Sequence, residues 1–302
     1  MAVPPGPPAQ PSTSTPVCYR HPGRETYVSC VRCGRPACPD CLRSAAVGQQ
    51  CVDCVRQGSR VTRRPAGLFG GPQASGAVVT WTLVALNVVA YLVEIAYSKI
   101  VEYGVLVGGP AFDPVIGQQV GVAHGQWYRL LTSMFLHETP GSGIGIFHIV
   151  FNMWALIVVG PSLERVLGRA RYLAVYLLSG LGGAVLFYLV APPLHEALGA
   201  SGAIFGLFGA WFVMGRRLRA DVRPIVMLIV LNLVITFVYR GTIAWQDHVG
   251  GLIAGTALTA AYAYAPRANR TVIQVAATVL LLALIVIGVV LRDQSLNGAA
   301  RF

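Results

Sequence analysis

Charged side chains are scarce in this sequence. Of its 302 residues only 12% are Asp, Glu, Lys or Arg, while 55% are hydrophobic and the mean hydropathy is +0.61. A soluble domain usually contains about 25% charged residues, so the composition argues against a soluble protein and favours a membrane protein. The first 16 residues also lack the basic and apolar regions of a signal peptide, and they are rich in Pro, Ser and Thr. We therefore expect residues 1–16 to form a disordered tail.

Cysteine is absent after residue 54. All seven cysteines lie within the first 54 residues, whereas the first long apolar run begins near Val78. This distribution excludes disulfide bonds and thiol chemistry from the apolar part of the chain. We expect a small head at residues 17–56, a basic Gly/Pro-rich linker at residues 57–77 and a membrane region that begins at residue 78.

The cysteines of the head form pairs with two intervening residues, and a histidine completes the first pair. Four such pairs fit two tetrahedral zinc sites, because a tight turn lets both side chains of a pair reach one ion. An iron–sulfur cluster or redox thiols are the alternatives, and a disulfide framework fits poorly with a cytoplasmic head. We therefore expect two zinc ions, with the ligands Cys18, His21, Cys30, Cys33, Cys38, Cys41, Cys51 and Cys54.

The order of these pairs resembles that of B-box-type cross-brace zinc fingers. The resemblance implies that the first pair shares one ion with the third pair, and the second pair shares the other ion with the fourth. A tandem arrangement is the alternative. A head of this size buries little apolar core and should unfold without its metal. We expect it to serve in binding or regulation, with an unknown partner.

Seven segments are long and apolar enough to be candidate membrane spans, since a hydrocarbon core roughly 30 Å thick needs about 20 residues of helix. The fourth and fifth of them are short and have uncertain ends. The segments are Val78–Tyr97, Ile144–Gly160, Tyr172–Val190, Ser201–Gly215, Pro224–Tyr239, Asp247–Tyr264 and Val272–Leu291.

Basic residues are distributed unequally between the two ends of these segments. If the N-terminus lies inside, 18 Lys and Arg residues fall on the inner side and 5 on the outer side. The positive-inside rule therefore predicts a cytoplasmic N-terminus and an external C-terminus. This bias accounts for the formal charge of +11 without a nucleic-acid partner. We expect a multi-pass protein of the plasma membrane.

Strongly polar side chains inside a bilayer are costly, so each one is a candidate functional residue. Ser201 opens the fourth segment, and His248 lies at the start of the sixth. His148 and Asn152 lie near the start of the second segment, on one helix face because they are four residues apart. All three groups fall within a turn or two of the outer end of their segment, which predicts one site open to the outer face.

Glycines repeat at four-residue intervals directly after the serine and the histidine. Small-residue faces of this kind let two helices approach closely. Such an approach would bring a serine hydroxyl within hydrogen-bond reach of an imidazole, about 2.6–3.2 Å. The intervals are formed by Gly202 and Gly206 in the fourth segment and by Gly251 and Gly255 in the sixth.

Together these groups resemble the signature of the rhomboid family. Further matches lie at Trp127-Tyr-Arg-Leu-Leu-Thr132, at Phe135-Leu-His137 and at Gly160-Pro-Ser-Leu-Glu164. The resemblance covers roughly residues 78 to 265. It implies an all-α membrane protein with a six-helix catalytic bundle at residues 78–265, here followed by a seventh helix and a short outer tail at residues 266–302.

Rhomboids are intramembrane serine proteases that hydrolyse peptide bonds in or beside transmembrane helices. By this resemblance Ser201 is the nucleophile and His248 its general base, and catalysis needs no cofactor. His148 and Asn152 donate hydrogen bonds to the oxyanion, next to Gly199 and the Ser201 backbone N–H. The resemblance also implies that the substrates are single-span or multi-span membrane proteins, which reach the site from the lipid bilayer.

Several residues near the predicted site are expected to have structural rather than catalytic roles. Phe205, where relatives often have Tyr, is expected to stack under His248. Adjacent helical residues point about 100° apart, so Asp247 is expected to face the outer interface rather than to complete a triad. The histidines of the outer connections are expected to be solvated; these are His124, His137 and His195.

Two other functions compete with proteolysis. A rhomboid-like pseudoprotease would bind membrane helices without cutting them, but inactive relatives typically lose the serine or the histidine, and this chain has both. A small transporter would be expected to show an internal repeat, and none is evident. If the chain is a protease, we expect it to cut helices weakened near their outer end by Gly or Pro. A lateral entry route beside the fifth segment, near Phe237 and Trp245, is a further hypothesis.

Overall fold

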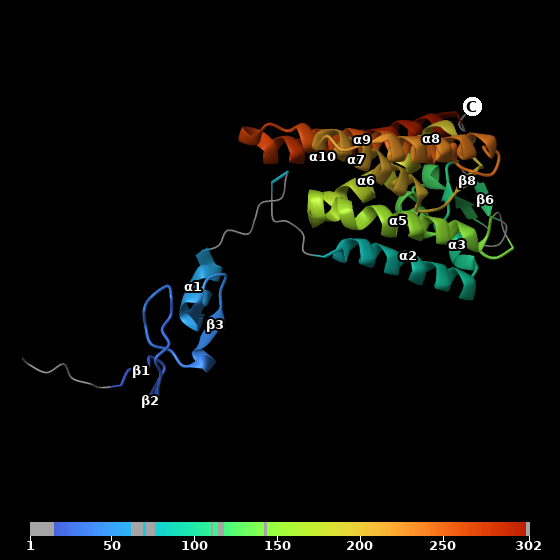
Figure 1. Cartoon of the computed structure of the whole chain (residues 1–302). Helices are drawn as coiled ribbons and strands as arrows, with labels where there is room; N and C mark the ends of the chain where they lie inside the picture. Colours follow the sequence, from blue (N-terminus) through green and yellow to red (C-terminus); the bar gives the residue numbers. More distant parts are fainter. Residues whose placement is uncertain are drawn as a thin grey trace, which may run out of the picture. The chain divides into compact units, whose positions relative to one another are not determined.

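A computed structural model describes residues 15–61, 69–70, 76–109, 111–113, 118–141 and 144–299 of the chain. The chain divides into two compact units, unit 1 (Met1–Arg64) and unit 2 (Pro65–Phe302), which are drawn in Figure 1. Most of the expected disordered tail, and the greater part of the expected linker, lie outside the described residues.

The described part of unit 1 contains two short antiparallel hairpins and a helix. Strand β1 (Val17–Cys18) pairs with β2 (His21–Glu25), β3 (Leu42–Ser44) pairs with β4 (Gln49–Cys51), and α1 (Val52–Val61) follows β4 directly. Helix α1 therefore continues beyond residue 56, where we expected the head to end. The core of unit 1 is made mainly of cysteines, since six of the eight buried residues in its cluster are Cys.

Unit 2 is predominantly helical, and one long helix lies in each of the seven predicted segments. Within the described residues, four helices are long and apolar enough to cross a membrane, and α8 is a shorter apolar helix. The prediction of a helical membrane protein is confirmed. The helices are α2 (Val78–Ala96), α3 (Lys99–Gly104), α4 (Arg129–Thr132), α5 (Ile146–Leu167), α6 (Arg169–Val190), α7 (Ser201–Leu218), α8 (Arg223–Val238), α9 (Trp245–Tyr264) and α10 (Arg270–Ala299).

Helices α7 and α9 are not among the four helices that qualify as spans by length and composition. Asp247 and His248 lower the mean hydropathy of α9, whereas Arg216 and Arg217 in its last turn lower that of α7. The count of six spans plus one therefore stays a prediction.

Two helices extend beyond their predicted ends. Helix α5 continues through Pro161 and ends at Gly168, whose φ of 81° is in the left-handed region that favours glycine. Helix α10 continues to Ala299, and its last turns contact α6 and the segment that precedes α4. The Asp293 carboxylate accepts hydrogen bonds from the Trp127 indole, at 2.8 Å, and from the Tyr188 hydroxyl. The expected outer tail is thus largely helical.

The connections between α3 and α4 and between α6 and α7 contain short strands that the sequence patterns do not predict. Strand β5 (Leu106–Val107) pairs with β8 (Glu196–Ala197), and β6 (Ala111–Asp113) pairs with β7 (Gln118–Val120). The buried Arg129 holds the first of these connections together. Its guanidinium donates to the backbone carbonyls of Glu102 and Val105 at 2.8 Å each and to the Gln126 side chain at 2.7 Å.

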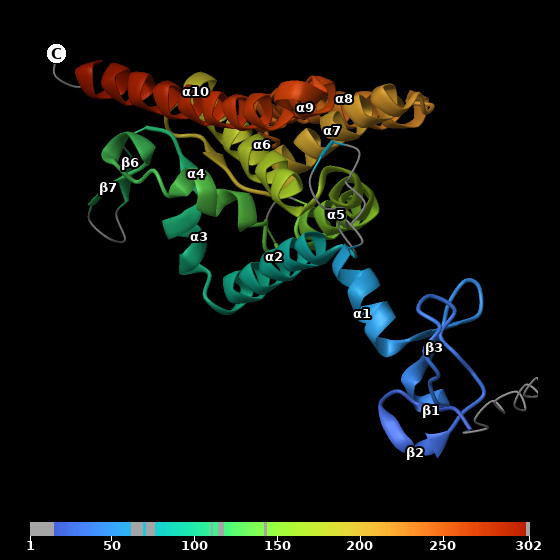
Figure 2. The same cartoon turned by 90° about the vertical axis from the view of Figure 1, so that its left-hand side faces the viewer.

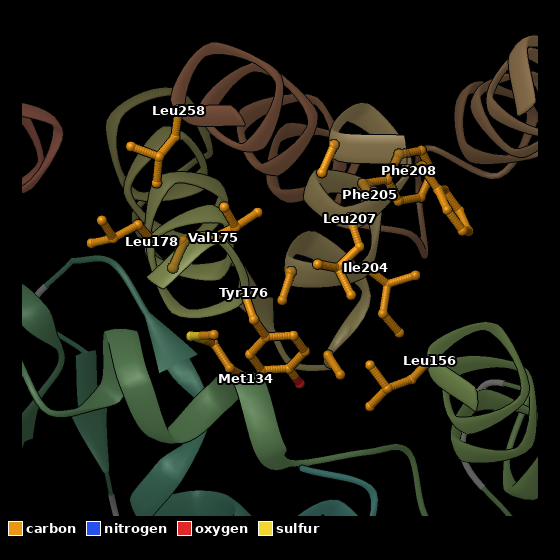
Figure 3. Close-up of a cluster of buried hydrophobic side chains, with 14 of the residues drawn as sticks. Met134, Leu156, Val175, Tyr176, Leu178, Ile204, Phe205, Leu207, Phe208 and Leu258 are labelled. Carbon is orange, nitrogen blue, oxygen red and sulfur yellow. The ribbon is translucent and has the colours of Figure 1, made fainter. Parts of the chain in front are cut away.

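The long helices lie in layers. Helices α8, α9 and α10 run along one side of unit 2, α6 and α7 lie beneath them, and α5 and α2 lie on the opposite side, as Figures 1 and 2 show. Apolar side chains of α5, α6, α7 and α9 meet in the core between these layers, together with Met134 from the segment between α4 and α5 (Figure 3). The middle layer thus buries α7, the helix that begins with Ser201.

Glycines set the close spacing of α7 and α9. A Cβ atom added to Gly251 would collide with the backbone of Gly202, and one added to Gly255 would collide with the backbone of Gly206. The two four-residue intervals therefore pack against each other, backbone on backbone. This contact fixes the distance between the first turns of the two helices, where Ser201 and His248 lie.

A buried carboxylate joins α2 to α5. Glu164 of α5 is fully buried and accepts hydrogen bonds from the backbone N–H groups of Val79 and Thr80 at 3.0 and 2.8 Å. These N–H groups lie in the first turn of α2 and have no partner within their own helix. The carboxylate therefore caps α2 from a neighbouring helix.

Candidate functional site

Ser201 is the first residue of α7 and is partly exposed. The chain enters the helix through Gly199, whose φ of 129° is one that other residues rarely adopt. The Gly199 N–H donates to the Ser133 carbonyl at 2.9 Å, which ties this turn to the segment between α4 and α5. The serine side chain is thus held at a helix N-terminus, where backbone N–H groups favour negative charge.

His248 lies in the first turns of α9 and is largely buried. Its Nε2 atom lies 2.8 Å from the Ser201 Oγ atom, a normal hydrogen-bond distance. The ring stacks on Phe205 of α7, with ring centroids 4.2 Å apart and an interplanar angle of 15°. The two residues that the sequence places 47 positions apart are therefore in direct contact, with the imidazole supported from one side.

His148 lies in the first turn of α5, and its Nε2 atom points toward Gly199 and Ser201. A Cβ atom added to Gly199 would lie 2.8 Å from His148 Nε2 and 3.5 Å from Ser201 Oγ, so only glycine leaves this space open. The His148 Nδ1 atom accepts a hydrogen bond from the Glu138 backbone N–H at 3.3 Å. In the neutral ring the proton is therefore on Nε2, which faces the site as a donor.

Asn152 lies one turn further along α5 and is buried. Its amide nitrogen donates to the His148 carbonyl at 2.8 Å, which leaves it a second N–H. Asn152 lies on the same helix as His148. Among the described residues, the Asn152 side chain makes no hydrogen bond to Ser201.

Two expectations about neighbouring residues are wrong. Asp247 does not face the outer interface: its carboxylate packs against Gly183 of α6 and Gly202 of α7 and accepts the Gly202 backbone N–H. The absence of a side chain at both glycines makes this inward position available. Asp247 therefore caps α7 and does not contact the imidazole.

His137 is also not a solvated loop residue. It is fully buried, its ring lies edge-on to those of Tyr91 and His148, and its backbone N–H donates to Glu94 at 2.9 Å. Burial lowers the pKa of His137 to about 3, so the ring is neutral at pH 7. His124 and His195 are exposed, as expected.

A threonine of α8 also contacts the site, and the sequence patterns did not indicate it. The hydroxyl of the buried Thr236 lies 2.8 Å from His248 Nδ1. A single hydroxyl on an apolar helix is usually bonded to its own backbone, so nothing in the sequence distinguishes Thr236. The available signal was its place near the outer end of the fifth predicted segment.

The eight cysteine and histidine ligand candidates of unit 1 form two clusters. Within each cluster the possible ligand atoms lie within 4.8 Å of one another; one cluster is Cys18, His21, Cys38 and Cys41, and the other is Cys30, Cys33, Cys51 and Cys54. The grouping alternates along the chain, as in a cross-brace and unlike a tandem arrangement.

The distances within the clusters fit zinc. Tetrahedral bonds of about 2.3 Å to sulfur and 2.0–2.1 Å to nitrogen place neighbouring S and N ligands about 3.6 Å apart, and two sulfurs about 3.8 Å apart. The His21 Nδ1 atom lies 3.7, 3.4 and 3.5 Å from the sulfurs of Cys18, Cys38 and Cys41. The sulfurs of Cys33 and Cys51 lie 3.8 Å apart. The residues therefore fit two tetrahedral metal ions.

Backbone N–H groups and arginines surround these sulfurs. Hydrogen bonds from the backbone of Cys51 and neighbouring residues hold the pKa of the Cys30 thiol below its ordinary value, at about 6. The Arg35 guanidinium donates to the Cys33 sulfur at 3.4 Å. At Cys30 and Cys33 these contacts favour the thiolate, which is the form that binds a metal.

Known proteins are similar to unit 2. Residues 124–265 match the family described as Rhomboid domain. A protein named putative rhomboid protease YdcA from Bacillus subtilis is 36% identical over 152 residues, which cover 49% of this chain and 73% of that protein. The chain belongs to the rhomboid family. The prediction of a rhomboid family member is confirmed.

Two further rhomboid relatives differ in how much of each protein is matched. Rhomboid protease GluP from Bacillus subtilis is 38% identical over 170 residues, or 55% of this chain and 32% of that protein. Rhomboid protease AarA from Providencia stuartii is 27% identical over 246 residues, or 68% of this chain and 81% of that protein. The chain thus spans about a third of the length of one rhomboid relative and most of another.

The rhomboid match at residues 124–265 includes all three polar groups of the site and the four paired glycines. It ends before α10 and begins after unit 1. Unit 1, α2 and α10 therefore lie outside the residues that match the rhomboid domain.

Proposed function

We propose that this chain is an intramembrane serine endopeptidase that hydrolyses peptide bonds in or next to transmembrane helices of other proteins. One observation carries the proposal: the 2.8 Å contact between Ser201 Oγ and His248 Nε2, on two helices that glycines bring together. A serine hydroxyl is a weak nucleophile until a base takes its proton. This contact supplies that base within a family whose curated members include named proteases.

In the proposed reaction, His248 Nε2 takes the hydroxyl proton as Ser201 Oγ attacks the scissile carbonyl carbon. The protonated imidazole then donates this proton to the leaving amine, and the C–N bond breaks to leave an ester on Ser201. Water, activated by the same imidazole, hydrolyses the ester and releases the second product. A dyad suffices, because the Asp247 carboxylate packs against α6 and α7 rather than against His248.

Hydrogen-bond donors near Ser201 support stabilisation of the oxyanion. The His148 Nε2–H beside Gly199, the Asn152 amide and the Ser201 backbone N–H are the proposed donors. The last of these belongs to the first turn of α7, where N–H groups have no partner in the helix. One such donor is worth about 3–4 kcal/mol in the transition state of acyl transfer.

The proposed substrates are single-span and multi-span membrane proteins whose helices unwind easily near the outer end. A shallow hollow of about 410 Å³ runs along α8 and is lined only by apolar residues, among them Val234 and Phe237. The aromatic rings of Phe237 and Trp245 touch where α8 approaches α9, with centroids 5.6 Å apart. These features support entry of a substrate helix from the lipid beside α8.

We further propose that residues 17–56 bind two zinc ions as a cross-braced head, that residues 78–265 form the catalytic bundle and that residues 266–302 add a seventh span. The distances in the two ligand clusters support the zinc ions. The charge bias of the connections supports a plasma-membrane protein with a cytoplasmic head and an active site that opens outward.

The proposal is tested with the full chain in membranes and a panel of tagged single-span proteins that carry Gly or Pro near the outer end of their helix. We expect wild type to cleave at least one of them. Ser201→Ala and His248→Asn should lower the cleavage rate at least about a thousandfold, since the nucleophile and its base act as a unit. Ser179→Ala is the matched control, because it removes another buried serine hydroxyl of the bundle.

Two outcomes would overturn the proposal. Cleavage that persists unchanged in Ser201→Ala would show that another group performs the reaction. If wild type instead retains the helices of the panel on purification and cuts none of them, the chain is a pseudoprotease that binds membrane helices.

A further inference from the structure

The imidazole of His248 has two nitrogens, and the proposed reaction uses only one of them. Nε2 faces Ser201, while Nδ1 faces away from it toward α8. Which nitrogen carries the proton decides whether Nε2 can accept the serine proton. In a serine protease this choice is set by the group that binds the other nitrogen. The partner of Nδ1 therefore matters to the chemistry as much as the serine contact.

Thr236 is that partner. Its Oγ1 atom lies 2.8 Å from His248 Nδ1 and 2.7 Å from the Asn232 carbonyl oxygen, one turn earlier in α8. A hydroxyl has a single hydrogen, and a carbonyl oxygen can only accept, so the Thr236 hydrogen is used in the bond to Asn232. The threonine oxygen must then accept the hydrogen of Nδ1. A neutral His248 thus carries its proton on Nδ1 and presents a lone pair at Nε2.

The surroundings leave no competing group for this bond. Thr236 is 1% exposed and His248 is 9% exposed, so bulk water has little access to either atom. The Asp247 carboxylate is turned toward Gly183 and Gly202. Within the described part of the chain, the Thr236 hydroxyl is the hydrogen-bond partner of Nδ1.

We propose that Thr236 is the positioning residue of His248: through its bond to the Asn232 carbonyl it holds the imidazole as the Nδ1–H tautomer, with Nε2 ready to accept the Ser201 proton. The proposal rests on the proposed dyad and adds a third member to it. The result is a chain of hydrogen bonds, here called the relay, which links the Ser201 hydroxyl, the His248 imidazole, the Thr236 hydroxyl and the Asn232 carbonyl of α8.

The relay makes the position of α8 part of the active site. Only two residues of α8 are buried: Ile225 near its first turn and Thr236 near its last turn. At about 1.5 Å per residue these anchors are some 16 Å apart. Displacement of the outer end of α8 would remove the acceptor from Nδ1, and the imidazole would lose its fixed tautomer. The base is therefore oriented only while α8 is docked.

Three variants of Thr236 isolate the hydroxyl. Thr236→Val and Thr236→Ala remove it, and Thr236→Ser restores it without the methyl group. The serine and alanine variants differ from each other by the hydroxyl alone, so this comparison holds even if valine crowds the imidazole. The control is Thr256→Val in α9, which removes a hydroxyl bonded in the same way to the carbonyl four residues earlier.

The first measurement reads the tautomer directly. Full-length protein labelled with ¹⁵N-histidine is studied by NMR in lipid nanodiscs, with His248 assigned by its loss in His248→Asn. We expect the Nδ1–H form in wild type, Thr236→Ser and Thr256→Val, and a mixture or the Nε2–H form in Thr236→Val and Thr236→Ala. An unchanged Nδ1–H signal in Thr236→Ala would overturn the proposal whether or not the chain is a protease.

The second measurement is the cleavage rate on a substrate found with the wild-type chain. We expect Thr236→Ala to lower kcat about tenfold, which corresponds to about 1.4 kcal/mol, with little change in KM. Thr236→Ser should recover most of the loss. Equal rates in Thr236→Ala and wild type would contradict the proposal alone, whereas cleavage that survives Ser201→Ala would contradict the dyad on which it rests.

Discussion

The cores of unit 1 and unit 2 are built from different kinds of side chains. In the described part of unit 1 the core is six cysteine side chains with Ala37 and Leu42, gathered around two ligand clusters. In unit 2 a large apolar cluster fills the space between long helices, and glycines let backbones touch. The first unit has the composition of a domain held by metal ions, the second that of a bundle held by close packing. Removal of metal should therefore destabilise unit 1, whereas a larger side chain in place of a glycine should destabilise unit 2.

Metal removal should have the largest effect, and only on unit 1. Binding of a structural zinc ion supplies about 10–16 kcal/mol, as much as the whole stability of an ordinary domain. We expect a strong chelator to abolish the dispersed amide NMR signals of unit 1 and to leave the thermal transition of unit 2 and substrate cleavage unchanged.

Elemental analysis tests the same contrast by counting the zinc ions bound to each chain. Wild type should contain two zinc ions per chain, and Cys41→Ser should lose the ion of its own cluster. Retention of a folded unit 1 after complete removal of metal would show that packing alone stabilises it.

A methyl group at Gly251 should have the next largest effect, and only on unit 2. Its Cβ would collide with the backbone of Gly202, which no rotamer change relieves. We expect Gly251→Ala to lower the unfolding free energy of the bundle by about 3 kcal/mol and to reduce cleavage, because α7 and α9 carry the two halves of the dyad. Gly241→Ala, with open space around it, is the control. Equal stability of the two variants in reversible unfolding would refute the backbone contact.

Glu164→Gln tests a polar anchor of the same bundle and should have a smaller effect. The carboxylate accepts two backbone N–H groups of α2, and an amide has only one oxygen to receive them. A buried donor left without a partner costs about 1–3 kcal/mol. We expect a loss of about 2 kcal/mol in unfolding measurements, against almost none for the exposed Glu102→Gln. A neutral result would mean that α2 is held by apolar contacts alone.

Phe205→Leu should have the smallest effect and should appear in activity rather than in stability. Leucine keeps most of the buried volume but removes the flat face on which His248 stacks. We expect kcat to fall about fivefold, as for the loss of about 1 kcal/mol. Phe208→Leu, an aromatic neighbour that does not stack on the imidazole, is the control. Parallel losses in both variants would assign the effect to general packing.

Parts of this structure could be predicted because they follow from local sequence patterns. Apolar runs located all seven long helices, and the four-residue glycine intervals anticipated which faces of α7 and α9 meet. The spacing of the cysteine pairs anticipated two clusters, while the choice between cross-brace and tandem required the fold. Ser201, His248 and His148 were predicted to share one site because each lies near the same end of its predicted span.

Other parts could not be predicted because they depend on contacts between distant segments. The burial of His137 follows from its packing on Tyr91 and His148, and the inward turn of Asp247 depends on two glycines of other helices. Thr236 resembles any hydroxyl in an apolar helix until α8 and α9 are placed side by side. The last turns of α10 likewise depend on distant partners, since Asp293 contacts Trp127 and Tyr188 of α6.

The most direct test of the account is covalent labelling of the nucleophile. The full chain in membranes is treated with a fluorophosphonate, which reacts with a serine only when a base activates it, and the modified residue is located by mass spectrometry. We predict a single label on Ser201, lost in His248→Asn and retained in Ser179→Ala. Failure to label Ser201, or equal labelling with and without His248, would contradict the claim that these two side chains form a catalytic dyad.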